Sequence, residues 1–250
     1  MVLLHGPAAN GTHWGSVISE LIETHRILAP DLPGQGASSA PDGELDSDLV
    51  FDWLGELIET TCASAPVLVG YALGGAIAAR FAAERPREVA SVVLVDALGL
   101  AEFEPLPEFG AALNAFLGEP SPATHEGLWR HCALDLDSLR GRMGDRWKPF
   151  EAYNLDRITT PGVQAALGAL MQEFGFPAIE AAELERIAVR TGLIWGRHDA
   201  ATPLAVAEGA SARYGWPLRV IDDCADDPPI ERPEAFLDAL YATLEAGEPR

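Results

Sequence analysis

The stretch Val69-Gly-Tyr-Ala-Leu-Gly-Gly75 joins two elements of different kinds. The short apolar run before it, 67–69, indicates a buried strand, and the alanine-rich segment after it, 74–84, indicates a helix. The glycines on both sides of Tyr71-Ala72-Leu73 have the spacing of a sharp strand-to-helix turn. The stretch therefore predicts a tight turn at the end of a buried strand, with Ala72 at its centre.

Short apolar runs and longer helical patterns alternate on both sides of this turn. The predicted strands are 2–4, 26–29, 67–69, 89–95, 192–195 and 218–221. The predicted helices are 14–23, 46–61, 74–84, 204–214 and 234–244. Such alternation is typical of an α/β fold in which a mostly parallel sheet is flanked by helices.

The middle of the chain has a different pattern. From about 98 to 190 the sequence consists of helical segments broken by proline and glycine, without a convincing strand. We interpret this block as an insertion that covers the sheet and not as an independent domain. The predicted organisation is a core formed by 1–97 and 191–250, with a helical lid formed by 98–190.

Composition limits the classes of partner. The chain has 250 residues, a formal net charge of −21 and 48% hydrophobic residues. This charge argues against nucleic acid or an anionic membrane as a partner, because both favour clustered Lys and Arg. The three cysteines have no metal-binding spacing, and the amino terminus lacks the pattern of an export signal. We expect a cytoplasmic protein with a small-molecule ligand or substrate; the sequence does not indicate its oligomeric state.

Six stretches, in matching order and spacing, resemble the α/β-hydrolase superfamily. They are His5-Gly6, Asp31-Leu-Pro-Gly-Gln-Gly36, Gly70-Tyr-Ala-Leu-Gly74, Val95-Asp96, Trp195-Gly-Arg-His-Asp199 and Glu231-Arg-Pro-Glu-Ala-Phe236. The resemblance implies the α/β-hydrolase fold, with a helical lid at the position of 98–190. It also implies one or two strands ahead of Val2, so either the sheet is short at that edge or the sequence starts partway into the fold.

The resemblance also shows where this sequence departs from the family's hydrolytic residues. Ala72 occupies the place of the serine nucleophile, and Asp226 occupies the place of the histidine. The family's first oxyanion donor is usually the N–H after His-Gly6, but that residue is Pro7, which has no N–H. Leu73 N–H remains as a single donor. Ala72 alone would fit an engineered serine-to-alanine change, whereas three separate departures favour a natural loss of serine hydrolysis.

A pair of carboxylates is the strongest catalytic candidate. Asp199 falls on the place of the family's acid, whose usual partner is the histidine that Asp226 replaces. If the two carboxyl groups converge in a covered site, they would share a proton and raise one pKa. Alternatively, Asp226 points to solvent within an acidic surface loop with Asp222, Asp223 and Asp227. Asp96, at the end of a predicted strand, is a third carboxylate candidate.

Histidines and aromatic residues provide further candidates. His13 and its neighbour Trp14 lie near the pocket mouth by family position, and His13 could replace the missing acid or base. His5 is interpreted as structural. The other candidates for lining the pocket are Tyr71, Trp129, Trp147 and Tyr153, with ordinary core packing as the alternative. No histidine has metal-ligand spacing with a second ligand, so we expect neither a metal nor a cofactor.

Three functions fit these residues. The first is a non-covalent acid/base enzyme, of the isomerase, lyase or cyclase type, that acts on a small apolar molecule. The second is a non-catalytic pseudo-hydrolase that binds a ligand. The third is a hydrolase in which a carboxylate activates water. Proton-exchanging carboxylates favour the enzyme, whereas an exposed Asp226 would favour the binding protein.

Overall fold

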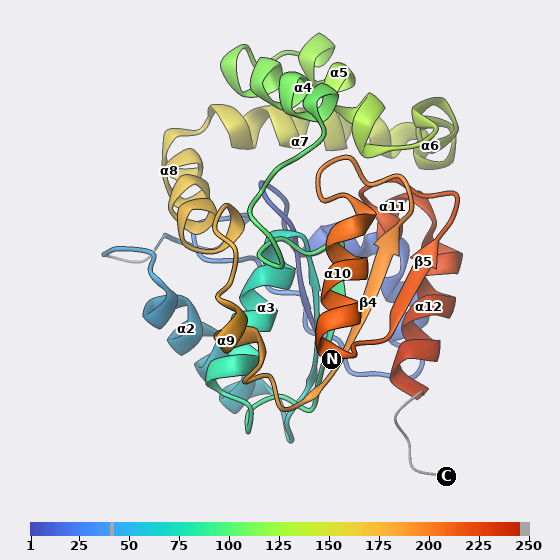
Figure 1. Cartoon of the computed structure of the whole chain (residues 1–250). Coiled ribbons are helices and arrows are strands. Elements are labelled where there is room, and N and C mark those ends of the chain that lie inside the picture. The colour runs from blue at the N-terminus through green and yellow to red at the C-terminus, as the bar shows by residue number, and fades with distance from the viewer. Residues whose placement is uncertain (41–42, 246–250) are drawn as a thin grey trace.

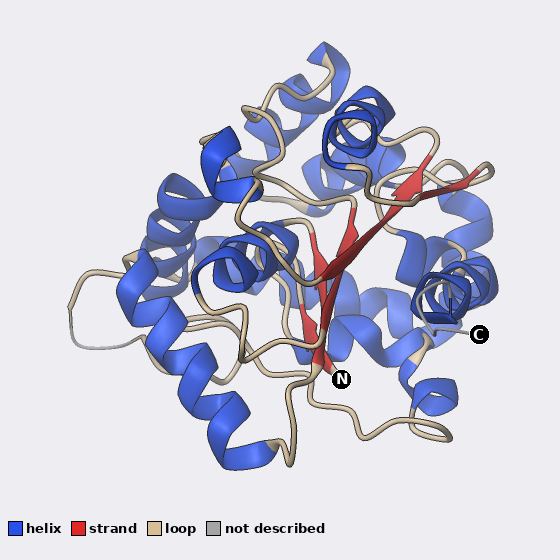
Figure 2. Ribbon diagram, turned by 60° about the horizontal axis from the view of Figure 1, so that its bottom comes forward, coloured by secondary structure: helices blue, strands red, loops and turns tan. Residues whose placement is uncertain are grey.

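A five-stranded parallel sheet forms the centre of the computed structural model, which describes residues 1–40 and 43–245. The strands lie side by side in chain order, and each neighbouring pair is parallel: β1 (Val2–Leu4), β2 (Val67–Tyr71), β3 (Ser91–Val95), β4 (Arg190–Gly196) and β5 (Leu218–Ile221). The predicted fold class, an α/β fold with a mostly parallel sheet flanked by helices, is confirmed. Figure 2 shows the sheet close to edge-on, with helices on both sides.

Successive residues of each strand contribute to two hydrophobic cores, one on each face of the sheet. Leu68 and Leu94 belong to the core under α2 (Ser47–Thr61), α3 (Leu73–Glu84) and α10 (Leu204–Tyr214). Val69 and Val95 belong to the core on the other face, under the 3-10 helix η1 (Gly11–Ser16), α1 (Ile18–Leu21) and α12 (Pro233–Glu245). Because side chains alternate along a strand, a strand buried on both faces is apolar at consecutive positions. This explains the continuous apolar runs in the sequence.

Two predicted elements near the amino terminus differ in the structure. The predicted strand 26–29 is reduced to one bridge between Val2 and Leu28. The predicted helix 14–23 is instead η1 followed by the four-residue α1, because Val17 between them leaves the helical conformation with φ −120°. The last five residues of the predicted core, 246–250, lie outside the described residues.

A layer of helices lies above the carboxyl ends of the strands, at the top of Figure 1. It consists of α4 (Pro107–Gly118), α5 (Pro122–Cys132), α6 (Leu136–Met143), η2 (Gly144–Arg146), α7 (Trp147–Thr159), α8 (Pro161–Leu170) and the π-helical turn η3 (Met171–Gly175). We call residues 107–175 the helical layer. Every residue from 98 to 189 is described and none is in a strand; the short α9 (Ala181–Leu184) leads back to β4.

The predicted turn between β2 and α3 is present and strained. Ala72 has φ 46° and ψ −110°, a conformation that residues other than glycine rarely adopt. The turn is tight enough that a Cβ on Gly70 would lie 2.3 Å from the Gly74 carbonyl oxygen. Ala72 N–H donates to the Val95 carbonyl at 3.0 Å, which ties the turn to the end of β3. The turn therefore presents residue 72 at the carboxyl edge of the sheet.

Candidate functional site

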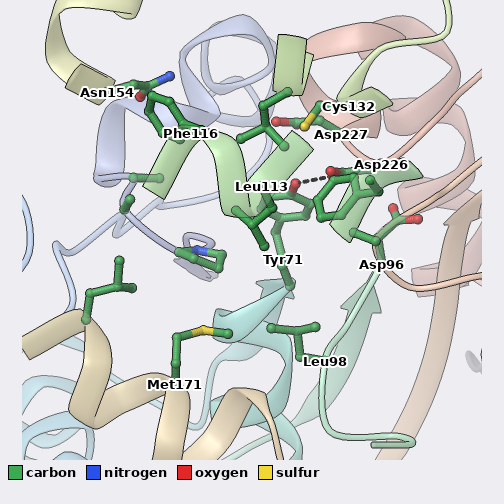
Figure 3. Close-up of a pocket in the computed structure, with 18 of the residues that line it drawn as sticks. Tyr71, Asp96, Leu98, Leu113, Phe116, Cys132, Asn154, Met171, Asp226 and Asp227 are labelled. Carbon is green, nitrogen blue, oxygen red and sulfur yellow. Dashed lines mark hydrogen bonds between the residues drawn. The ribbon is translucent and has the colours of Figure 1, made fainter. Parts of the chain in front are cut away.

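A cavity of about 460 Å³ lies between this edge of the sheet and the helical layer. Most of its wall is apolar; the helical layer supplies, among others, Phe109, Leu113, Phe116, Leu128 and Leu167. The acidic side chains Asp96, Asp199, Asp226 and Asp227 line the cavity together with Tyr71. Figure 3 shows Tyr71, Asp96, Asp226 and Asp227 on one side of the cavity. No Lys or Arg is found among the described residues that line the cavity.

Tyr71 and Asp226 form a buried hydrogen-bonded pair on the cavity wall. The Tyr71 hydroxyl donates to Asp226 Oδ1 at 2.6 Å, as the dashed line in Figure 3 marks. Burial, together with the charge of Asp227, raises the pKa of Asp226 from its ordinary value of 3.8 to about 7, although the Tyr71 hydrogen bond opposes the shift. The pKa of Tyr71 lies well above its ordinary range for the same reason, burial. Near neutral pH, Asp226 is therefore the member of the pair that gains or loses a proton, whereas Tyr71 keeps its hydroxyl proton.

Two further carboxyl groups line the cavity beside this pair. Asp199 Oδ1 accepts the backbone N–H groups of Ala201 and Thr202, each at 2.8 Å. Asp96 Oδ1 accepts Gly196 N–H at 2.9 Å. The second oxygen, Oδ2, of both Asp96 and Asp199 is buried, and the two carboxyl groups lie close enough to share a hydrogen bond when one of them is protonated. Burial raises the pKa of each of these two carboxyl groups well above its usual range. The charge of Asp199 raises the pKa of Asp96 further, and the charge of Asp226 raises the pKa of Asp199 further.

The predicted pair, Asp199 and Asp226, thus lines one cavity, and the charge of Asp226 raises the pKa of Asp199. The hydrogen bond of Asp226 Oδ1, however, comes from Tyr71 and not from Asp199. A proton shared by the two aspartates stays a prediction. The alternative in which Asp226 points to solvent is wrong, because Asp226 and Asp227 are buried and only Asp222 and Asp223 are exposed.

The side chains of His13 and Asp227 contact each other and pack against the Tyr71–Asp226 pair. The His13 ring stacks on the Tyr71 ring, with centroids 4.7 Å apart and planes 11° apart. His13 Nε2 lies 3.3 Å from Asp227 Oδ1, and both side chains are 5% exposed. Asp227 also caps α11 (Pro228–Glu231) by accepting Ile230 N–H at 3.4 Å. An imidazole in contact with a carboxylate therefore lies beside the Tyr71–Asp226 pair, although its Nε2 makes no hydrogen bond within the described residues.

The loop that carries Asp226 is fixed by its backbone. The Glu231 carboxylate accepts Ala225 N–H at 3.1 Å and Leu134 N–H, from the helical layer, at 3.2 Å. Asp226 N–H donates to the Cys132 carbonyl at 3.4 Å. On the opposite side the loop lies so close to β4 that a Cβ on Gly196 would be 1.6 Å from the Ala225 carbonyl oxygen. These contacts position residue 226 independently of its side chain.

The predicted turn and oxyanion residues lie at the base of the cavity. Pro7 and the Ala72 methyl group line it, whereas Leu73 is buried in the core below. Gly6 lies against the Tyr71 ring, since a Cβ at this position would be 2.6 Å from a ring carbon. The group that the resemblance places at the nucleophile position therefore has no atom that could attack a substrate.

Of the predicted lining residues, His13, Tyr71 and Trp129 line the cavity, and three others lie elsewhere. Trp14 is fully buried in the core on the other face of the sheet, and Trp147 is in the internal core of the helical layer. Tyr153 donates from its hydroxyl to the Ala9 carbonyl at 3.3 Å. These three side chains therefore pack in a core or bind the backbone, and they do not line the cavity.

His5 has the structural environment that the sequence suggests. Its Nε2 accepts Leu32 N–H at 2.9 Å, and its Nδ1 lies 2.8 Å from the Gly6 carbonyl oxygen. Burial lowers the pKa of His5 to about 4, so the ring is neutral.

Sequence reasoning missed the role of Asp227 and the lining residues Cys132, Asn154 and Gln164. The run Asp226-Asp227-Pro228-Pro229 offers one signal for Asp227, because proline after an aspartate is a common way to begin a helix with a capping side chain. No three His, Cys, Asp or Glu side chains within 1–40 and 43–245 are grouped so that they could hold a metal ion. The expectation of no metal stays a prediction.

Comparison with known proteins identifies the family of this chain and its fold. The sequence pattern of the alpha/beta hydrolase family matches residues 1–239. The chain belongs to this family. Among curated proteins, it is 29% identical over 246 residues to a pimeloyl-(acyl-carrier protein) methyl ester esterase of Aromatoleum aromaticum, covering 94% of this chain and 93% of the relative. It is 26% identical over 265 residues to an uncharacterised protein of Mycobacterium tuberculosis, covering 100% and 76%.

Solved structures of other alpha/beta hydrolases have the same fold. A 2-hydroxy-6-oxo-6-phenylhexa-2,4-dienoate hydrolase from a Rhodococcus strain superposes with a TM-score of 0.82 at 23% identity, covering 98% of this chain and 89% of the other. A serine-to-alanine mutant of a meta-cleavage product hydrolase from Pseudomonas fluorescens gives 0.79 at 23%, covering 99% and 90%. At this identity the likeness concerns the fold. Over the described residues, no helix is long and apolar enough to cross a membrane.

Proposed function

We propose that this member of the alpha/beta hydrolase family is a cofactor-independent enzyme that transfers protons on a small, largely apolar molecule, without a covalent intermediate. The reaction is of the isomerase, lyase or cyclase type. The helical layer serves as the lid that excludes water from the cavity.

The observation that carries this proposal is the buried Tyr71–Asp226 pair in a cavity whose lining is mostly apolar. A general acid or base is most effective when its pKa is close to the working pH, and the pKa of Asp226, about 7, meets this condition. The ionised carboxylate accepts a proton from the substrate, and the Tyr71 hydroxyl stabilises that carboxylate. The protonated carboxyl group returns the proton at another atom, so the enzyme is unchanged after the cycle.

His13 is the second proton-transfer group. Asp227 contacts its Nε2 side, and stacking on Tyr71 fixes the plane of the ring. An isomerisation that moves a proton between two atoms is faster when one group removes a proton while another supplies one. His13 contacts the ring of Tyr71 and Asp226 its hydroxyl group, so the two residues can share these two roles.

The residues do not support serine hydrolysis. Ala72 has no nucleophile, and losing single members of a catalytic triad costs roughly 10^4-fold to 10^6-fold in turnover. The curated relatives include esterases, which favours one other candidate, a hydrolase in which Asp226 activates water directly. Such an enzyme would hydrolyse esters without forming an acyl intermediate.

Carbon–hydrogen exchange tests the proposal. The protein is incubated in D2O with a panel of small apolar ketones and unsaturated ketones, and loss of substrate C–H signals is followed by proton NMR. We expect exchange or isomerisation for the compounds that bind, with at least a tenfold loss in Asp226→Asn and in Tyr71→Phe. Asp222→Asn, which alters an exposed aspartate four positions away, is the matched control and should retain the wild-type rate.

Two outcomes would overturn the proposal. If compounds bind but neither exchange nor rearrange, the protein is a ligand-binding member of the family. If the same panel extended with aryl esters shows hydrolysis that depends on Asp226, while no exchange occurs, carboxylate-activated hydrolysis takes its place.

A further inference from the structure

We propose that Asn154, from the middle of α7, is a specificity-determining residue that binds a hydroxyl group at the far end of the ligand. The ligand is then polar at both ends and apolar between them, with one end at Tyr71 and Asp226 and the other at Asn154. The inference deepens the proposed function, because it describes the substrate class for the same cavity. It rests on that function only for the polar end that Tyr71 and Asp226 bind.

Asn154 is a polar residue in the mostly apolar wall that the helical layer contributes. It is partly buried and lines the cavity together with apolar neighbours such as Phe116 and Ile158. Figure 3 shows Asn154 beside Phe116 and away from Tyr71 and Asp226. The cavity therefore has a second polar place, separate from the proton-transfer pair.

A buried histidine holds the side-chain amide of Asn154. Asn154 Nδ2 lies 3.0 Å from His125 Nε2, within hydrogen-bonding distance. His125 is 0% exposed and packs among four aromatic rings with centroids 5.7–6.1 Å away, those of Phe116, Trp129, Trp147 and Phe150. Burial lowers the pKa of His125 to about 4, so the ring is neutral.

The positions of the protons in this pair follow from the environment of His125. Its Nδ1 is buried and has no hydrogen-bond partner within the described residues. A neutral imidazole carries one proton, and an N–H group interacts favourably with aromatic rings, whereas a bare acceptor nitrogen among them gains nothing. The proton is therefore on Nδ1, and the Asn154 amide donates one N–H to Nε2. This leaves the amide oxygen, Oδ1, and the second N–H of Asn154 to bind a ligand.

The pair accounts for an otherwise costly residue. Burying an imidazole in an aromatic core costs free energy, and an apolar side chain would fill the same place without that cost. What His125 supplies is a fixed acceptor for Asn154, so the orientation of the amide is set before a ligand arrives. A group held in its binding orientation loses little conformational entropy when it binds.

The chemistry of the amide indicates the group that it binds. Asn154 offers one acceptor and one donor and carries no charge. A hydroxyl group both donates and accepts, so it can bond to Oδ1, to the second N–H or to both. A charged group would lose its hydration at this place without an opposite charge from Asn154. The amide therefore favours a neutral hydroxyl group.

Three matched pairs of methyl ketones test the inference. The members of a pair differ only at the far end, which is a hydroxyl in one and a methyl group in the other. The pairs are 6-hydroxyhexan-2-one and heptan-2-one, 8-hydroxyoctan-2-one and nonan-2-one, and 10-hydroxydecan-2-one and undecan-2-one. Calorimetry gives each Kd for wild type and for Asn154→Leu, which has a similar size without polar atoms. Comparing both probes in both proteins cancels the difference in their hydration.

We expect one of the three hydroxyl-ended ketones, the one whose length matches the cavity, to depend on Asn154. It should bind Asn154→Leu at least about threefold more weakly than wild type, which is the contribution of one neutral hydrogen bond. Its methyl-ended partner should bind Asn154→Leu at least as tightly as wild type. Asn114→Leu is the matched control, because Asn114 is an exposed asparagine on α4 of the same helical layer, and both Kd values should stay unchanged.

Gln164, from α8, also lines the cavity with an amide and provides the alternative position for the hydroxyl group. Gln164→Leu should keep the wild-type ratio of the two Kd values. Loss of the hydroxyl preference in Gln164→Leu, together with its retention in Asn154→Leu, would overturn the inference.

Variants of His125 test its role as a positioning residue. His125→Gln retains an acceptor near the place of Nε2 and should keep most of the hydroxyl preference, whereas His125→Leu should lose it although Asn154 is present. If His125 only packs, both variants change the stability and leave the ratio of the two Kd values as in wild type. The comparison of Asn154→Leu with Asn114→Leu decides the question even if His125→Leu fails to fold.

The outcomes separate this inference from the proposed function. If no hydroxyl-ended ketone binds wild type more tightly than Asn154→Leu, the inference fails, and the D2O experiment still decides the acid/base function. If the hydroxyl preference depends on Asn154 but no compound exchanges protons through Asp226, the preference stands and the acid/base function fails.

Discussion

Ala72 keeps the backbone of a catalytic turn without a reactive side chain. Its φ of 46° places it where residues other than glycine are strained, by roughly 1–3 kcal/mol. The strain persists because the surrounding hydrogen bonds require it: the Ala72 carbonyl accepts Leu98 N–H at 3.1 Å, and Ala72 N–H donates to Val95. The turn is therefore part of the framework of the fold, apart from any chemistry at residue 72.

Restoring the serine should not restore ester hydrolysis. We expect Ala72→Ser to hydrolyse p-nitrophenyl butyrate within about twofold of wild type, because Asp226 stands where the resemblance places the histidine and Pro7 offers no N–H. Release of p-nitrophenolate measures the rate. The double variant Ala72→Ser/Asp226→His is the comparison, and it should exceed both single variants. Hydrolysis by Ala72→Ser alone at the rate of a working esterase would contradict our interpretation of Asp226 and Pro7.

Asp226 should make stability depend on pH. Its pKa is higher in the folded protein, about 7, than its ordinary value of 3.8, so the folded state binds the proton more tightly. The wild type therefore loses stability as the pH rises from about 4 to about 7, and Asp226→Asn does not incur this loss. We expect urea unfolding to show similar stability for both proteins at about pH 4. At about pH 8 the variant should be more stable, by up to about 4 kcal/mol.

The same measurement on Asp222→Asn provides the control, because Asp222 is exposed and should show no such divergence. A constant difference between Asp226→Asn and wild type across this pH range would mean that the pKa of Asp226 is the same in the folded and the unfolded state.

At the scale of residues, the sequence could point to Asp226 but not to its partner. Position in the family pattern places Asp226 at the site, and Asp199 and Asp96 are found in the same way. Tyr71 is 155 positions away from Asp226 along the chain, and only the assembled fold shows that the two are hydrogen-bonded. His13 was one of several possible histidines until the structure placed it between Tyr71 and Asp227.

At the scale of elements, Gly6, just after the end of β1, packs against Tyr71 and so helps to position the site. The residue follows β1 and lies under the Tyr71 ring at the end of β2, where a side chain would meet the ring at 2.6 Å. Tyr71 therefore depends on the neighbouring strand for its position, and so does its hydrogen bond to Asp226.

Gly6→Ala should displace Tyr71. We expect a loss of about 1–3 kcal/mol in the free energy of unfolding, measured by urea denaturation, because the methyl group overpacks a rigid contact. Proton transfer should fall with it. Gly15→Ala is the matched control, since no atom lies within 4 Å of a Cβ at that position, and its effect should stay below about 0.5 kcal/mol. Wild-type stability in Gly6→Ala would show that Tyr71 can move without cost.

Elements with strong local signals were predictable, and those that depend on few contacts were not. The β-branched run before Asp96 indicated β3 because a strand buried on both faces needs apolar residues throughout. Three of the prolines that interrupt 98–190 begin helices: Pro107, Pro122 and Pro161 are the first residues of α4, α5 and α8. The run 26–29 has strand composition, but only one bridge pairs it with β1.

At the scale of the whole molecule, the net charge of −21 acts on stability. Like charges over one compact body repel each other, and dissolved salt screens this repulsion.

Salt should therefore stabilise the protein. Raising sodium chloride from about 20 mM to about 500 mM at about pH 8 should raise the midpoint of thermal unfolding by several degrees. Near about pH 4.5, where most of the net charge is lost, the gain should be much smaller. An equal rise in the unfolding midpoint at both pH values would mean that general salting-out, and not screening of charge repulsion, stabilises the protein.

The contact between Gly196 and the Ala225 carbonyl has a consequence for how this family changes its chemistry. Because the backbone at 225 and the two hydrogen bonds of Glu231 fix the loop, the next side chain always starts from the same point at the cavity wall. An imidazole can be exchanged there for a carboxylate without refolding the loop. Changing the side chain at position 226 then alters the chemistry at the cavity wall while the path of the backbone is preserved.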